Sequence, residues 1–72
     1  MTRTKIRIDT MSDVNKFVAT MGKIKDRVWL EDDEGNRVNA KSLLGALYSL
    51  EWSDIYCYSE TDISSKLLQW MV

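Results

Sequence analysis

Few side chains in this 72-residue sequence could do chemistry, because it contains no histidine and only one cysteine. Without histidine, phosphoryl transfer through an imidazole, acid–base catalysis by histidine and most zinc sites are excluded. No glycine-rich phosphate loop is present, and no nucleophile is paired with a base. Cys57 alternates with Ile55, which predicts a small core residue rather than a reactive thiol. We therefore expect no catalytic residue, no metal site and no cofactor.

The charge balance bears on the kind of partner. Ten basic and eleven acidic residues give a net charge of −1, and the basic residues occur singly or in pairs between acids. A nucleic-acid or anionic-membrane binder needs a clustered basic face, so we expect neither partner. No apolar run approaches the roughly 20 residues that span a bilayer. With a single cysteine and no signal-peptide pattern, the expected location is the cytoplasm.

Hydrophobic periodicity predicts the elements that must position any site, within one domain covering residues 1–72. Period-two alternation predicts strands at Lys5–Asp9, Arg27–Glu31, Arg37–Asn39 and Asp54–Ser59. Apolar stripes predict helices after Thr10, from about Lys41 to Leu50, and from Thr61 to Met71. The order β-α-β-β-α-β-α predicts an α+β fold, a four-stranded antiparallel sheet with three helices on one face.

The second predicted helix is unusual in its apolar content. We expect its four leucines, Leu43, Leu44, Leu47 and Leu50, to point inward. Gly45 inside a helix costs up to about 1 kcal/mol relative to alanine, which indicates close packing or close approach of backbone at this position.

The stretch before this helix carries a family resemblance. The residues from Val38 to Gly45 read Val-Asn-Ala-Lys-Ser-Leu-Leu-Gly and connect the third strand to the second helix. Together with the element order, they resemble the histidine-containing phosphocarrier protein (HPr) family of the bacterial sugar phosphotransferase system. The resemblance implies an open-faced β-sandwich, with the fourth strand between the first and the second. It also implies a bacterial or phage origin.

The sequence departs from that family where the family does its chemistry. The family places a phosphoryl-accepting histidine, followed by arginine and proline, before the first helix. The corresponding stretch here, Asp9–Val14, has none of these residues, and Asp13 adds negative charge where a phosphate needs cations. The phosphocarrier reaction is therefore chemically unavailable to this chain, which we expect not to be an enzyme.

Ser42 has two interpretations. In the family, a serine at this helix start is the target of an ATP-dependent regulatory kinase, so the resemblance marks Ser42 as a phosphorylation site. A phosphate there would be stabilised by the free amides of the helix start. The alternative is that Ser42 only caps the helix, since serine is a favoured N-cap residue.

Two surfaces could contact a partner protein. Trp29, Tyr56 and Tyr58 should lie together on the uncovered face of the sheet, as an interaction surface or simply as its covering. Lys41, Leu44 and Tyr48 lie on the second helix, which the resemblance implies to be a docking surface for partner proteins. The alternative is that the apolar residues of this helix are buried against the last helix.

These observations lead to two functional hypotheses. The first is a non-catalytic, HPr-like protein-binding or regulatory module of the phosphotransferase type, with Ser42 as its site of control and a kinase or regulator as its partner. The second is a structural domain that forms a homodimer through the uncovered sheet face.

Overall fold

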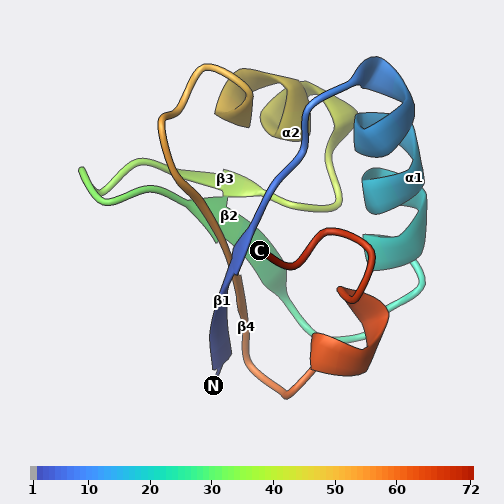
Figure 1. Ribbon diagram of the computed structural model, residues 1–72. Helices are drawn as coiled ribbons and strands as arrows, with labels where there is room; N and C mark the ends of the chain where they lie inside the picture. The colour runs from blue at the N-terminus through green and yellow to red at the C-terminus, as the bar shows by residue number, and fades with distance from the viewer. Residues whose placement is uncertain (1) are drawn as a thin grey trace.

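The computed structural model describes residues 2–72 (Figure 1). Its elements are β1 (Thr2–Ile6), α1 (Met11–Met21), β2 (Val28–Glu31), β3 (Arg37–Asn39), α2 (Leu43–Ser49), β4 (Ile55–Ser59) and a 3₁₀ turn at Ser64–Lys66. Within residues 2–72 there are thus two α-helices where the sequence predicts three. No helix in this range is long and apolar enough to cross a membrane.

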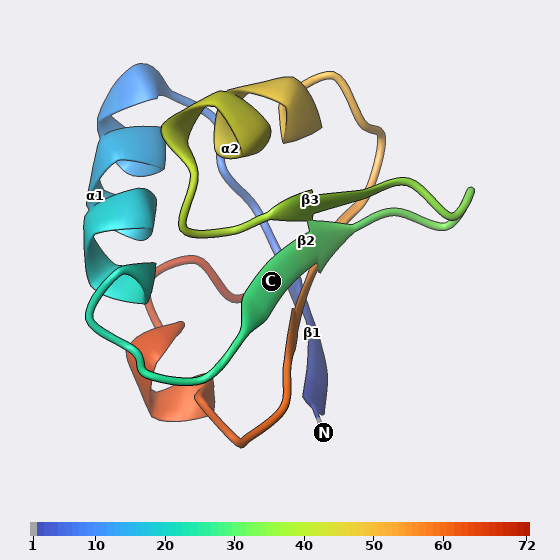
Figure 2. The same cartoon turned by 180° about the vertical axis from the view of Figure 1, so that it is seen from behind.

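The four strands form one antiparallel sheet in the order β1-β4-β2-β3. The register pairs Leu30 of β2 with Val38 of β3 and with Cys57 of β4. Both helices cover the same face of the sheet, and the other face carries no helix (Figures 1 and 2). The predicted α+β fold with an open four-stranded antiparallel sheet is therefore confirmed.

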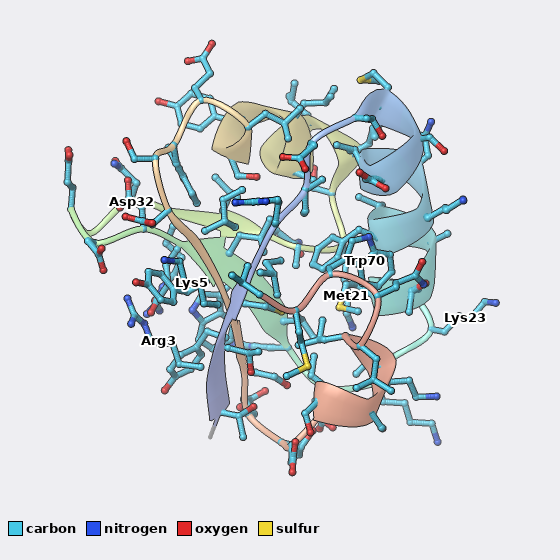
Figure 3. All side chains as sticks on the ribbon, viewed as in Figure 1. Arg3, Lys5, Met21, Lys23, Asp32 and Trp70 are labelled. Carbon is cyan, nitrogen blue, oxygen red and sulfur yellow. The ribbon has the colours of Figure 1, made fainter. Side chains whose placement is uncertain are left out.

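Strand alternation sends one set of side chains toward the helices. The buried residues of the sheet include Ile6, Val28, Leu30, Ile55 and Cys57. From α1, the buried positions follow the predicted stripe and are Val14, Phe17 and Met21. The Phe17 ring meets the Trp70 ring edge to face at 5.2 Å between centroids. Figure 3 shows Met21 and Trp70 on the α1 side of the sheet, with Arg3 and Lys5 on the opposite side.

Helix α1 begins where the sequence predicts, at a threonine cap. The Thr10 hydroxyl accepts a hydrogen bond from the Asp13 amide at 3.1 Å, and the Asp13 carboxylate accepts one from the Thr10 amide at 3.3 Å. This reciprocal pair satisfies two amides that have no partner inside the helix. Asp13 is therefore part of the helix cap.

The predicted third helix is not present as an α-helix. Ser64–Lys66 forms a single 3₁₀ turn, and beyond it the Arg7 amide donates to the Trp70 carbonyl at 2.8 Å. Met71 then makes an isolated antiparallel bridge with Ile6. Pairing with the continuation of β1 competes with helix formation in a segment too short to be a stable helix by itself. Of the apolar stripe predicted for that helix, Ile63, Leu67 and Trp70 are buried, whereas Met71 is 44% exposed, so its inward placement is wrong.

Candidate functional site

Ser42 is the N-cap of α2. Its backbone is extended (φ −100°, ψ 125°), and its hydroxyl accepts a hydrogen bond from the Gly45 amide at 3.2 Å. The side chain therefore does what an N-cap serine does, which is to satisfy one free amide of the first turn. The residue is half-buried at the surface. The capping interpretation is confirmed, whereas phosphorylation of Ser42 stays a prediction.

Lys41 holds the segment before α2 in place. Its ammonium group donates a hydrogen bond to the backbone carbonyl of Ile24, in the connection between α1 and β2. Its backbone amide donates to the Asn39 side-chain oxygen at 2.8 Å. Lys41 thus ties together two connections that are far apart in the sequence.

Helix α2 is turned differently from the prediction. Ala46 and Ser49 are its buried residues, whereas Leu43 and Leu44 are exposed, so the inward placement predicted for these two leucines is wrong. The reason lies at Gly45, where a β-carbon would stand only 2.9 Å from the Asn39 carbonyl oxygen. The glycine lets the helix pack directly on the backbone of β3, as its presence predicted, and this contact turns Leu44 outward.

The outward side of α2 carries apolar side chains that are exposed to solvent. Leu44 is 79% exposed and Tyr48 is 59% exposed, and their spacing of four residues places them on one side of the helix. Leu43 is exposed beside them. We call these three residues the α2 surface. The Tyr48 ring contacts the Trp52 ring edge to face at 6.3 Å between centroids. The alternative that these residues are buried against a last helix is therefore wrong for Leu44 and Tyr48.

The sheet face that carries no helix, called here the open face, gathers side chains from all four strands. The register forms two neighbouring rows, one of Arg3, Tyr58, Trp29 and Asn39 and the next of Lys5, Tyr56, Glu31 and Arg37. The Trp29 and Tyr58 rings stack at 4.7 Å between centroids, with 29° between their planes. The predicted aromatic group on this face is therefore present.

These rings are largely covered by arginine side chains. The Arg3 guanidinium lies 3.6 Å from the centroid of the Tyr56 ring. The Arg37 guanidinium lies 4.7 Å from the centroid of Trp29 and 5.5 Å from that of Tyr58. Cation–π contact and the apolar stems of these arginines shield the rings from water.

Glu31 fixes both arginines. Its carboxylate accepts one hydrogen bond from Arg3 at 2.8 Å and another from Arg37 at 2.9 Å. Burial of Glu31 raises its pKa, but the hydrogen bonds from the two guanidinium groups outweigh burial and leave the pKa below its ordinary value of 4.5. The Glu31 side chain is only 15% exposed, so it is the least solvated charge of this network.

Beside the open face, Lys41, which was predicted to contact a partner, lies together with three basic residues that were not predicted to belong to a site. Lys25, Arg27, Arg37 and Lys41 line a shallow groove of about 480 Å³, together with Val28, Trp29, Val38 and Asn39. We call this the basic groove. Its cations come from two segments that are adjacent only because β2 and β3 pair. The even spacing of the cations within each segment (25 and 27, 37 and 41) was the available signal, since strand-like alternation places such residues on one side.

Cys57 and the acidic side chains form neither a reactive thiol nor a metal site in the described part of the chain. Burial raises the pKa of the Cys57 thiol to about 12, so the thiol is protonated at neutral pH. Among residues 2–72, no group of three acidic or cysteine side chains could hold a metal ion. Comparisons with protein-family models, curated proteins and solved structures find no match.

Proposed function

We propose that this chain is a non-catalytic, HPr-like protein-binding module of the bacterial cytoplasm, and that it contacts its partner through the α2 surface. The observation that carries the proposal is the exposure of Leu44 and Tyr48, at 79% and 59%. A contiguous apolar patch beside polar surface is typical of a protein-interaction site. Tyrosine is also among the residues that contribute most to binding energy.

The α2 surface supports binding better than the open face does. On the open face, Arg3 and Arg37 already lie against the aromatic rings and are held there by Glu31. A partner would have to displace these arginines before it reached Trp29 or Tyr56. Leu44 and Tyr48 need no such rearrangement. Homodimer formation through the open face is therefore the second candidate.

Ser42 gives the α2 surface a means of control, because it stands at the first turn of the same helix. Its hydroxyl is the N-cap acceptor for the Gly45 amide. A phosphate on this oxygen would keep acceptor atoms beside the free amides and add a charge of about −1.5 to −2. That charge, placed two residues from Leu44, would change which partner surfaces can approach α2.

The experiment is phosphorylation by a bacterial HPr kinase with ATP, followed by intact mass spectrometry. We expect one phosphate on the unmodified protein and none on Ser42→Asn, because asparagine keeps the N-cap acceptor but has no hydroxyl. The double variant Leu44→Ser/Tyr48→Ser should be phosphorylated at least about tenfold more slowly, which corresponds to the loss of about 1.4 kcal/mol of contact.

Circular dichroism of each variant is the control, and it should show unchanged helix content. Absence of phosphate on the unmodified protein would overturn regulation at Ser42. Equal phosphorylation rates for the unmodified protein and the double variant would show that the kinase does not use the α2 surface.

A further inference from the structure

The basic groove lies at the end of the β2–β3 pair that is opposite the hairpin turn. There, the connection from α1 enters β2 and the connection from β3 leaves toward α2, as Figure 2 shows. Lys25, Arg27, Arg37 and Lys41 line it, and no acidic side chain does. In a chain of net charge −1, such a concentration of cations marks a site for a negatively charged ligand.

Two acidic residues lie near the groove, and hydrogen bonds hold their carboxylates, which keep their negative charge. The Asp26 carboxylate accepts a hydrogen bond from the Thr61 hydroxyl at 3.0 Å, and the Glu60 carboxylate accepts one from the Arg27 backbone amide at 3.1 Å. Arg37 is the one groove cation whose charge is paired, with Glu31 at 2.9 Å.

The other three cations have no carboxylate within ion-pair distance among residues 2–72. These are Lys25, Arg27 and Lys41. Lys41 donates to the Ile24 carbonyl, but an ammonium group has three donors and keeps its full charge. At least three positive charges of the groove are thus available to a ligand.

The groove is preformed. The Lys41 ammonium bonds the Ile24 carbonyl across it, and the Ala40 amide bonds the Val28 carbonyl at 3.1 Å. Strand addition at β3 is obstructed, because Gly45 of α2 packs on the backbone of Asn39. The ligand must therefore bind through its charge and its shape rather than as a fifth strand.

One aromatic side chain, Trp29, lies in the lining of the groove, together with the planar guanidinium of Arg37. The Trp29 ring stacks on Tyr58, and the Arg37 guanidinium lies over both rings. A nucleobase stacks on aromatic rings and on arginine planes alike. In addition, the Trp29 indole N–H is buried and meets no hydrogen-bond acceptor among residues 2–72. This N–H is an unpaired buried donor, which costs free energy of folding.

We propose that the basic groove binds single-stranded nucleic acid, with phosphates at Lys25, Arg27 and Lys41 and a base stacked on the Arg37–Trp29 platform. The cationic lining without acids differs from a protein–protein interface, where lysine is depleted. The proposal differs from the expectation, drawn from the charge balance, that the chain binds no nucleic acid. The difference arises because folding brings together cations that are dispersed in the sequence. It is a different site from the α2 surface.

The test is fluorescence anisotropy of a labelled oligothymidylate of about 12 nucleotides, titrated with the full chain. Each phosphate neutralised on a single strand contributes about −0.7 to the slope of log K against log salt concentration. Three contacts predict a slope of about −2, so affinity should fall about 20-fold between about 50 and 200 mM salt.

Charge reversal identifies the site. Lys25→Glu/Arg27→Glu should reduce the slope to about −0.7 or abolish binding. Lys16→Glu/Lys66→Glu is the matched control, because it alters the net charge equally at exposed positions that do not line the groove, and it should leave binding nearly unchanged.

Three results would overturn the proposal. They are no binding at low salt, equal weakening by both pairs of substitutions, and equally tight binding of a poly-glutamate peptide, which has charge but no bases. Leu44→Ser/Tyr48→Ser should leave oligonucleotide binding unchanged. The proposals for the basic groove and for the α2 surface can therefore be refuted independently of each other.

Discussion

The open face and the α2 surface both present aromatic or apolar side chains to solvent, but they differ in what lies over them. On the open face, Tyr56 lies under the Arg3 guanidinium and Trp29 under that of Arg37. On α2, Leu44 and Tyr48 have no such cover and are mostly exposed. The two surfaces have similar residue types, but arginine side chains cover the rings of the open face, whereas Leu44 and Tyr48 are exposed to solvent.

Local geometry explains the difference. On the open face, each arginine reaches the ring diagonally across from it on the neighbouring strand. Arg3 pairs with Tyr58 but lies over Tyr56, and Arg37 pairs with Glu31 but lies over Trp29. A seven-residue helix has fewer than two full turns, and one side of α2 already packs on β3 through Gly45. Apolar residues on its other sides have nothing left to cover them.

The largest change in stability is expected when the Glu31 carboxylate, which holds both arginines over the rings, is removed. Glu31→Gln should lower the free energy of unfolding by about 1–2 kcal/mol, because two charged hydrogen bonds are lost, discounted for the exposure of both arginine partners. It should also make Trp29 and Tyr56 more accessible. Urea unfolding gives the free energy, and acrylamide quenching reports exposure of tryptophan.

Glu34→Gln is the matched control for this prediction, since Glu34 lies in the turn of the same hairpin, is exposed and makes no ion pair among residues 2–72. It should change stability by less than about 0.5 kcal/mol. If the two variants were equally stable, the arginine cover of the open face would not depend on Glu31.

The pH dependence of the unfolding free energy should show whether the Glu31 network stabilises the protein through its charge or through packing. The pKa of Glu31 is lowered in the folded protein, so its stabilisation is present above 4.5 and is lost as the pH falls through the lowered value. The difference in unfolding free energy between the protein and Glu31→Gln should thus be full at neutral pH and shrink toward zero in acid. A difference that did not change with pH would assign the effect to packing.

Periodicity predicted all four strands, but it placed the first at Lys5–Asp9, whereas β1 spans Thr2–Ile6. Two of the three inner positions of β1 are the threonines Thr2 and Thr4, which give no apolar alternation. The buried Ile6, Leu30 and Cys57 follow from alternation alone. The last segment was predicted as a helix because Ile63, Leu67 and Trp70 have helical spacing. The same three residues are buried by a 3₁₀ turn and a bridge to β1, since burial requires only that they face the core. Pairing between distant segments is not visible in a local pattern.

The sequence predicted the helix cap at Ser42, but it predicted neither the rotation of α2 nor the basic groove. Ser42 as a cap depends on its immediate neighbours, and the sequence shows those. The rotation of α2 depends on contact between Gly45 and the backbone of Asn39, and the basic groove depends on Lys25 lying across from Lys41. The rotation of α2 and the basic groove both result from tertiary packing, so neither the net charge nor the apolar stripe of a helix could predict them.

The smallest effect on stability is expected at the α2 surface. Leu44→Ser and Tyr48→Ser should each change the free energy of unfolding by less than about 0.5 kcal/mol, because both side chains are already mostly in water. Leu47→Ser on the same helix is the matched control, and should cost about 1–2 kcal/mol since Leu47 packs against the core. Urea unfolding measures all three. A large loss for Leu44→Ser would mean that this residue supports the fold, and the case for a binding surface on α2 would then disappear.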